Sequence, residues 1–206
     1  MARPRSDINE RVLRAAGARF LRDGVDGASL REIARDARTS VGMVTYYFPT
    51  KDALFAAVVE HAYSGLLDDI AAALAPDAPF ERQVARLHTR LATLSDEEFL
   101  VLRLVLREVL VASPRTPALL ARFSRGHIPL VLDAVAGAYL RGEVREGVNP
   151  VAAILATLFA GIGAQIAWRL FAASTPLAEV VASPTALADA VRDVIFRGLA
   201  PAPRGP

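Results

Sequence analysis

Apolar residues recur every three to four positions along most of the chain, which is the spacing of one buried face on an α-helix. Alanine, leucine and arginine dominate these segments and favour helices, and no strand-like alternation bounded by hairpin turns occurs. The pattern predicts an all-α fold of about nine helices. Their expected positions are 7–22, 29–36, 40–47, 51–74, 80–94, 96–111, 117–141, 150–172 and 184–198.

One segment has the length of a membrane span. Residues 151–168 carry no charge over 18 positions, which is about the shortest stretch that crosses a bilayer. The alternative is a helix buried in a soluble core or a subunit interface. Polar residues within the segment and alanines at 152, 156, 160 and 164, which would let another helix approach closely, favour that alternative. No membrane partner is therefore expected.

Residues 29–48 predict two short helices joined by a tight turn. Ser29 with Glu32 three residues later indicates a capping box that begins the first helix, and Ser40 can cap the second, which ends before Pro49. Such a pair occurs in many helical proteins, but it is also the helix-turn-helix unit, whose second helix enters the DNA major groove. The residues that would face outward from that helix are Thr39, Val41, Met43, Thr45 and Tyr46, with Gly42 permitting close backbone approach.

The distribution of charge points to a polyanionic partner. The chain has a net charge of +2, yet its first 55 residues hold 10 basic and 7 acidic side chains, whereas the remainder holds 14 basic and 15 acidic ones. A basic N-terminal segment on a near-neutral body is typical of nucleic-acid binding.

Residues 7–60 resemble the N-terminal domain of the TetR family of transcriptional regulators. The matching positions are Phe20, Gly24, Ser29, Ile33, Ala34, Ala37, Ser40, Gly42, Tyr47, Phe48, Lys51 and Leu54. Three positions depart from the family pattern: Arg38 replaces the usual turn glycine, Thr39 replaces valine, and Thr45 stands where tyrosine is common. These departures leave the fold prediction intact but prevent any operator sequence from being inferred by analogy.

The resemblance implies a domain organisation and a set of DNA contacts. Residues 1–50 would form a three-helix DNA-binding domain, 51–199 a helical domain for effector binding and dimerisation, and 200–206 a disordered tail. Ser29 and the first amides of its helix would bind a phosphate, as would Tyr47 and Lys51, and Ser40 joins the candidates for base contact. The partners expected are double-stranded DNA, with a pseudo-palindromic site, and a second copy of the chain.

The larger C-terminal part offers candidates for an effector site and a dimer surface. Arg103 and Arg107 would be either an anion-recognising pair or a surface stripe. Five further residues would line a largely apolar cavity or simply fill the core: Phe123, His127, Phe159, Gln165 and Trp168. The helices near 150–172 and 184–198 are the candidates for the homodimer interface, with packing inside one subunit as the alternative.

Composition narrows the function classes. The chain has no cysteine, and its three histidines lie too far apart for a helical metal pair, so we expect neither metal nor cofactor. Hydrolase, metalloprotease and phosphate-loop motifs are missing, which disfavours an enzyme with an incidental basic head. The polar first ten residues predict a cytoplasmic protein. The sequence thus favours a regulator, most simply a repressor released by a small, largely apolar effector; an architectural DNA binder without an effector is the other alternative.

Overall fold

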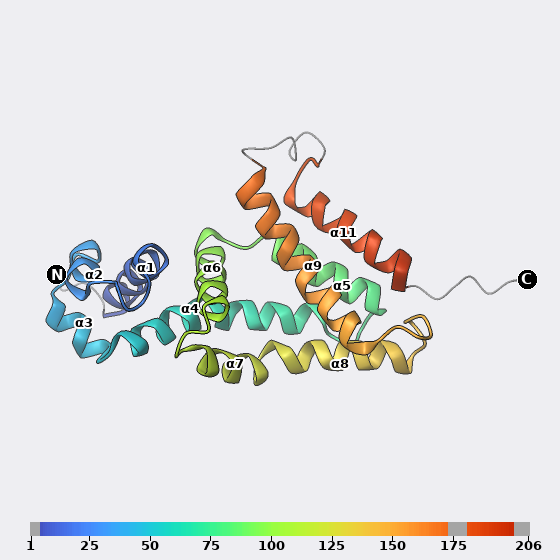
Figure 1. The fold of residues 1–206 in the computed structure, drawn as a ribbon, viewed down its shortest axis with the longest axis horizontal. Coiled ribbons are helices and arrows are strands. Elements are labelled where there is room, and N and C mark those ends of the chain that lie inside the picture. Colours follow the sequence, from blue (N-terminus) through green and yellow to red (C-terminus); the bar gives the residue numbers. More distant parts are fainter. Residues whose placement is uncertain (1–4, 173–180, 200–206) are drawn as a thin grey trace, which may run out of the picture. The chain divides into compact units, whose positions relative to one another are not determined.

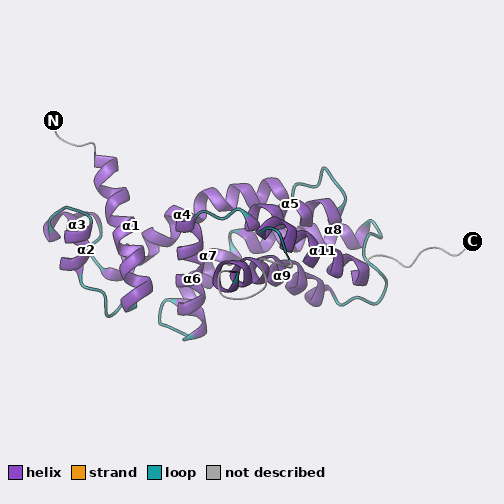
Figure 2. Ribbon diagram, turned by 90° about the horizontal axis from the view of Figure 1, so that it is seen from above, coloured by secondary structure: helices purple, strands orange, loops and turns teal. Residues whose placement is uncertain are grey.

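The computed structural model describes residues 5–172 and 181–199, and these ranges form ten α-helices and no strand (Figures 1 and 2). The helices are α1 Arg5–Asp23, α2 Leu30–Asp36, α3 Val41–Tyr47, α4 Lys51–Ala73, α5 Phe80–Ala92, α6 Asp96–Leu110, α7 Thr116–Ser124, α8 His127–Leu140, α9 Pro150–Phe171 and α11 Pro184–Leu199. The predicted all-α fold is confirmed. The tail expected at 200–206 lies outside the described residues.

The chain divides into two compact units. The first comprises residues 1–66 and 95–122, and the second comprises residues 67–94 and 123–206, so the division falls within α4. This division follows contacts between residues and does not assign a function to either part. The functional boundary expected near residue 50 therefore stays a prediction.

The first unit has a core built on α1. Val12, Ala16 and Phe20 lie on one face of α1 and are fully buried, and the Phe20 ring lies 6.3 Å from the ring of Phe55 on α4. Helix α1 packs against α2 and α6, and α2 packs against α3. The short helix α2 thus depends on α1 for a hydrophobic base, and α3 depends on α2, because two-turn helices are marginal on their own.

The second unit has a core in which α5, α9 and α11 pack against one another, with α8 against α5 and α9. The Phe80 and Phe196 rings of α5 and α11 lie 5.9 Å apart. Helix α9 meets α5 closely at Gly161, where an added β-carbon would lie 2.9 Å from both His88 Cδ2 and Leu91 Cδ1. The buried row of α9 is Ala153, Thr157, Gly161, Ala164 and Gln165, so much of the alanine ridge seen in the sequence lies beside the packed face.

Helix α9 is long and apolar enough to cross a membrane, and no other helix within residues 5–172 and 181–199 is. Length and composition are weak evidence, because the core helix of a water-soluble protein meets the same test. One face of α9 packs against α5 and α11. Only 28% of its most apolar 18-residue window is buried, so a second apolar face is left uncovered by the described residues.

The prediction of one continuous helix at 117–141 is wrong, because the structure divides this segment into α7 and α8. The break falls at Gly126, the N-cap of α8, which has φ −111° and ψ −112°. Pro129 explains the division, since a proline inside a continuous helix would clash with the carbonyl of Arg125 and remove one hydrogen bond. In the first turn of a new helix that proline costs nothing.

Candidate nucleic-acid interface

Residues 37–40 connect α2 to α3 in a tight turn. Thr39 N donates to Ala34 O at 2.9 Å and Arg38 N donates to Arg35 O at 3.0 Å, the hydrogen-bond pattern of a Schellman motif. Arg38 takes the left-handed position of this motif, with φ 52°, which glycine usually fills. The turn sets the direction in which α3 leaves α2.

Small and apolar side chains hold the two helices together. Ile33 and Ala34 of α2 and Val44 of α3 are between 0 and 2% exposed. At the start of α3, Ser40 Oγ accepts a hydrogen bond from Met43 N at 3.2 Å, which confirms the predicted N-cap. The arrangement is the helix-turn-helix expected from the sequence.

The capping box predicted at the start of α2 is wrong. Ser29 occupies the N-cap position, but its side chain makes no capping hydrogen bond. Glu32 instead accepts from Arg19 Nη1 at 2.6 Å. A pair between guanidinium and carboxylate is stronger than a hydrogen bond from a neutral amide, so the carboxylate turns toward α1. The phosphate contact expected of Ser29 stays a prediction.

One side of α3 faces away from the core. Tyr46 is 75% exposed and Val41 is 36% exposed. Of the other residues expected to contact bases, Ser40, Gly42 and Thr45 are exposed, whereas Thr39 and Met43 are half-buried. Thr45 Oγ1 donates to the Val41 carbonyl at 3.1 Å, and the residue is exposed. Such a surface suits the thymine methyl group and base-edge donors in a major groove.

Of the residues expected to bind phosphate besides Ser29, Tyr47 ends α3 and Lys51 begins α4. Tyr47 is half-buried, with its ring 5.3 Å from the ring of Tyr46. Lys51 Nζ donates to Asp26 O at 2.5 Å and to Ala28 O at 3.2 Å, so it also holds the loop before α2. An ammonium group has three donors, and these two bonds leave one for a phosphate oxygen.

Arg19 braces α2 against α1. Its side chain is 10% exposed, and Nε donates to Asp36 Oδ2 at 2.6 Å while Nη1 reaches Glu32. The hydrogen bond from Arg19 holds the pKa of the Asp36 carboxyl below its ordinary value. Sequence reasoning missed Arg19, although its spacing from Val12 and Ala16 puts it on the buried face of α1.

The residues predicted for an effector site do not all come together. Arg103 and Arg107 lie on α6 in the first unit, and both are exposed. Arg107 Nη1 donates to Leu21 O at 2.9 Å at the carboxyl end of α1. Cations stabilise that end of a helix, so Arg107 already has a structural role.

The other five predicted effector residues belong to the second unit and differ in their burial. Gln165 is 1% exposed, whereas Phe159 is 61% exposed. The rings of Phe123 and His127 lie 5.2 Å apart across the break between α7 and α8, and Trp168 is half-buried. Of the five, Gln165 alone lies deep in the core.

Gln165 belongs to a set of buried polar side chains that we call the polar seam: Gln83 and His88 of α5, and Thr157 and Gln165 of α9. Each is 1% exposed. His88 Nε2 lies 3.0 Å from Thr157 O. Among the described residues, no hydrogen-bond partner is present for Gln83 Oε1, His88 Nδ1, Thr157 Oγ1 or either amide atom of Gln165. Burial lowers the pKa of His88, so the seam carries no charge near neutral pH. Buried polar atoms without partners are rare in proteins and commonly mark a place for water or a ligand.

Sequence reasoning missed His88, although it shares the apolar face of α5 with Val84 and Leu91. Within the described part of the chain, no group of three or more histidine or acidic side chains could hold a metal ion.

Comparison with known proteins agrees with this geometry. Residues 12–58 match the family model described as bacterial regulatory proteins, tetR family. An uncharacterized HTH-type transcriptional regulator of Bacillus subtilis strain 168, YvdT, is 34% identical over 101 residues. That match covers 49% of this chain and 48% of YvdT, so the chain spans about half the length of the curated relative it matches.

Solved structures extend the likeness in fold to nearly the whole chain. The transcriptional regulator FadR from Bacillus subtilis, in complex with stearoyl-CoA, has a TM-score of 0.74 at 13% identity and covers 92% of this chain and 98% of its own. A bacterial regulatory protein in the tetR family from Rhodococcus RHA1 also has a TM-score of 0.74, at 22% identity, with 95% and 98% covered. The N-terminal helix-turn-helix is thus matched in sequence by the tetR family model, and the all-helical fold is matched in structure by a bacterial regulatory protein in the tetR family.

Proposed function

We propose that this protein is a DNA-binding transcriptional regulator that contacts base edges with α3. The exposed side of that helix carries the proposal: it presents Val41, Thr45 and Tyr46 outward from a helix whose opposite side is anchored by Val44. A helix held rigidly with short side chains outward is what major-groove contact requires. The match of residues 12–58 to the tetR family model supports the same function.

Fluorescence anisotropy with labelled duplexes tests this function. The duplexes cover the promoter beside the protein's own gene, and a duplex of shuffled sequence serves as the reference. We expect the affinity to fall steeply with salt, with a slope near −0.9 per phosphate contacted. Replacing Tyr46 or Thr45 with alanine should reduce the preference for the promoter by about tenfold. The matched control is Leu120→Ala, because Leu120 is 51% exposed on α7. A DNA affinity that does not change with salt and is the same in the α3 variants would contradict the proposal.

We also propose a homodimer formed through α9 and α11. The uncovered side of α9 includes Val151, Leu155 and Phe159, which are 47 to 61% exposed, and Val194 on α11 is 72% exposed. These side chains and the small alanines beside them would form an apolar interface that one subunit cannot bury alone. Two copies would place two α3 helices on half-sites about 34–36 Å apart, or a multiple of that distance.

The second unit is the proposed effector-binding part, with repression relieved when the effector binds. Its polar seam offers donors and acceptors without charge inside an otherwise apolar core, which suits a largely apolar molecule with a neutral hydrogen-bonding group. The structurally similar FadR binds stearoyl-CoA, so a long-chain acyl thioester is the first compound to test. An effector of this kind would lower DNA affinity only if it bound better to the form that does not bind DNA.

The effector proposal is tested by titrating stearoyl-CoA and the matching free fatty acid into the preformed complex of protein and DNA. Release of DNA supports repression relieved by a ligand, and we expect Gln165→Leu to raise the concentration needed by about tenfold. A parallel titration with Leu120→Ala should match the wild type, since Leu120 is exposed on α7 and is part of neither the polar seam nor the proposed dimer face. Tighter DNA binding on titration would indicate a co-repressor instead.

A further inference from the structure

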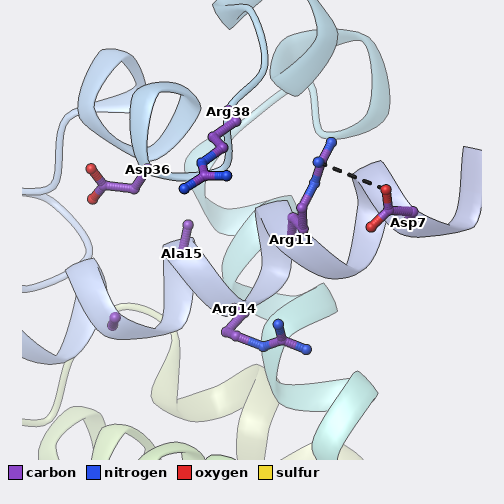
Figure 3. A pocket seen from close by; sticks show the side chains of 7 residues that line it. Asp7, Arg11, Arg14, Ala15, Asp36 and Arg38 are labelled. Atoms are coloured by element: carbon purple, nitrogen blue, oxygen red, sulfur yellow. Dashed lines mark ion pairs between the residues drawn. The ribbon is translucent and has the colours of Figure 1, made fainter. Parts of the chain in front are cut away.

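A hollow of about 520 Å³ lies on the surface of the first unit, between α1 and the turn that leads into α3 (Figure 3). Its lining from α1 is Asp7, Arg11, Arg14, Ala15 and Ala18, and its lining from the end of α2 and the turn is Asp36 and Arg38. In Figure 3 the Arg38 side chain extends from the turn toward α1 and Ala15. The helix-turn-helix residues expected from the sequence to bind DNA are not part of this lining.

The charges around the hollow do not balance. Asp36 accepts from Arg19 at 2.6 Å, and Asp7 lies 3.7 Å from Arg11, so each carboxylate already has a cation. Arg14 and Arg38 are exposed and have no ion-pair partner among the described residues. The hollow therefore carries excess positive charge.

Arg11, which also lines the hollow, has an unsatisfied donor. Its Nε is buried and has no hydrogen-bond partner among the described residues. A guanidinium presents its donors as a planar fork that matches two oxygens of a phosphate. Arg11, Arg14 and Arg38 all line the hollow, and a guanidinium matches the chemistry of a phosphate group.

The backbone at Arg38 is an independent observation. With φ 52°, Arg38 occupies a conformation that disfavours any side chain, at a position that glycine fills without strain. Strain kept at one residue is a reason to look for a function of its side chain. The strained residue, Arg38, lines the hollow with its side chain.

We propose that this hollow, through Arg11, Arg14 and Arg38, binds a phosphate of the DNA backbone. The inference rests on the proposed function and adds a contact to it. Arg38 lies two residues before Ser40, the N-cap of α3, so a phosphate held there belongs to the duplex that α3 enters and fixes the register of the helix in the groove. Arg38 thus lowers folding stability through its strained backbone and raises DNA affinity through its side chain.

The test compares substitutions at Arg38 in the full-length chain. Arg38→Asn removes the charge but keeps a residue that tolerates the left-handed region, Arg38→Gly also removes the strain, and Arg38→Lys keeps the charge without the fork. Binding to a shuffled duplex of about 30 base pairs is followed by anisotropy at several salt concentrations, because phosphate contacts do not depend on sequence. Urea unfolding of each variant gives the stability.

We expect Arg38→Asn and Arg38→Gly to weaken binding by about tenfold and to reduce the salt slope by about one, with Arg38→Lys in between. Arg38→Gly should at the same time raise the folding equilibrium constant by about fivefold. Ala112→Gly is the control matched for strain, since Ala112 has φ 49° after α6 and no charge, and should gain stability without changing DNA affinity. Arg145→Asn is the control matched for charge, on an exposed loop of the second unit.

If Arg38→Asn kept the DNA affinity and the salt slope of the wild type, the inference would be overturned, while DNA binding by α3 would stand. If the wild-type protein showed no salt-dependent DNA binding, the proposed function itself would fail. Calorimetry with inorganic phosphate distinguishes free phosphate from a phosphate of the DNA backbone as the ligand of the hollow. Phosphate binding lost in Arg38→Asn, with duplex binding unchanged, would overturn the assignment to the DNA backbone.

Discussion

Arg115 Nη2 lies 2.5 Å from Asp26 Oδ1, although 89 residues separate them in the sequence. The same guanidinium donates to Asp52 at 2.6 Å and reaches Glu108 at 3.3 Å. It therefore joins the loop before α2, the start of α4 and the buried side of α6. The loop and α4 are also joined by Lys51, so the position of the α2–α3 pair depends on this cluster.

Replacing Arg115 with glutamine should destabilise the first unit. Glu108 is 4% exposed, and the substitution leaves its carboxylate buried without a cation, which costs about 1–3 kcal/mol. Urea unfolding measures the loss. Arg86→Gln is the control, because Arg86 and Asp77 form a solvent-exposed pair, and it should change stability little. An equal effect of the two substitutions would contradict a special role for Arg115.

The Arg115 cluster also predicts a dependence on acid. The hydrogen bond from Arg115 holds the pKa of Asp26 below its usual value of about 4. Between the usual pKa of Asp26 in the unfolded chain and its lowered pKa in the folded chain, the unfolded chain binds more protons than the folded one. The stability that Asp26 contributes is therefore complete above pH 4 and is lost as the pH falls further. The difference in unfolding midpoint between wild type and Arg115→Gln should shrink below pH 4. A constant difference from pH 7 to pH 3 would exclude this linkage.

His88 makes a separate prediction at milder pH. Burial lowers its pKa from the usual value of about 6.5, so the unfolded chain takes up a proton before the folded one does. The stability of the second unit should be complete above pH 6.5 and decline as the pH falls below it. Unfolding midpoints at pH 7.5, 6.5 and 5.5 test the decline, which His88→Gln should flatten. His61→Gln, at a side chain 42% exposed in the first unit, should keep the wild-type slope.

The close approach of α9 to α5 predicts opposite effects for two glycine substitutions. A β-carbon at Gly161 would lie 2.9 Å from His88 Cδ2 and Leu91 Cδ1, so Gly161→Ala should cost about 1–3 kcal/mol through overpacking. Gly65 on α4 has nothing within 4 Å of such an atom. Gly65→Ala should therefore gain about 0.5–1 kcal/mol from helix propensity alone. Chemical denaturation measures the stability of both variants. If Gly161→Ala were stabilising as well as Gly65→Ala, the α5–α9 contact would be shown to relax around the added methyl group.

These features differ in how well the sequence predicts them. Most helix positions and the helix-turn-helix follow from local periodicity and from caps such as Ser40, so they were predictable, whereas the division of 117–141 into α7 and α8 was missed. The partners of Glu32 and Arg107 were not, because they lie on α1, distant in the sequence, and a sequence pattern does not weigh a capping bond against an ion pair. His88 and Gln165 share one buried seam only because α5 and α9 pack together, which no spacing within either helix reveals.

The proposed dimer makes the last prediction. Phe159 is 61% exposed on α9, and Phe159→Asp would place an unpaired charge in the proposed apolar interface, where removing it from water is costly. Sedimentation velocity should show a dimer for the wild type and mainly monomer for Phe159→Asp. DNA affinity should fall together with dimerisation, since one α3 helix offers few contacts. Leu120→Asp introduces the same charge on α7 and should leave the dimer intact. A Phe159→Asp dimer that binds DNA like the wild type would exclude this face of α9 from the interface.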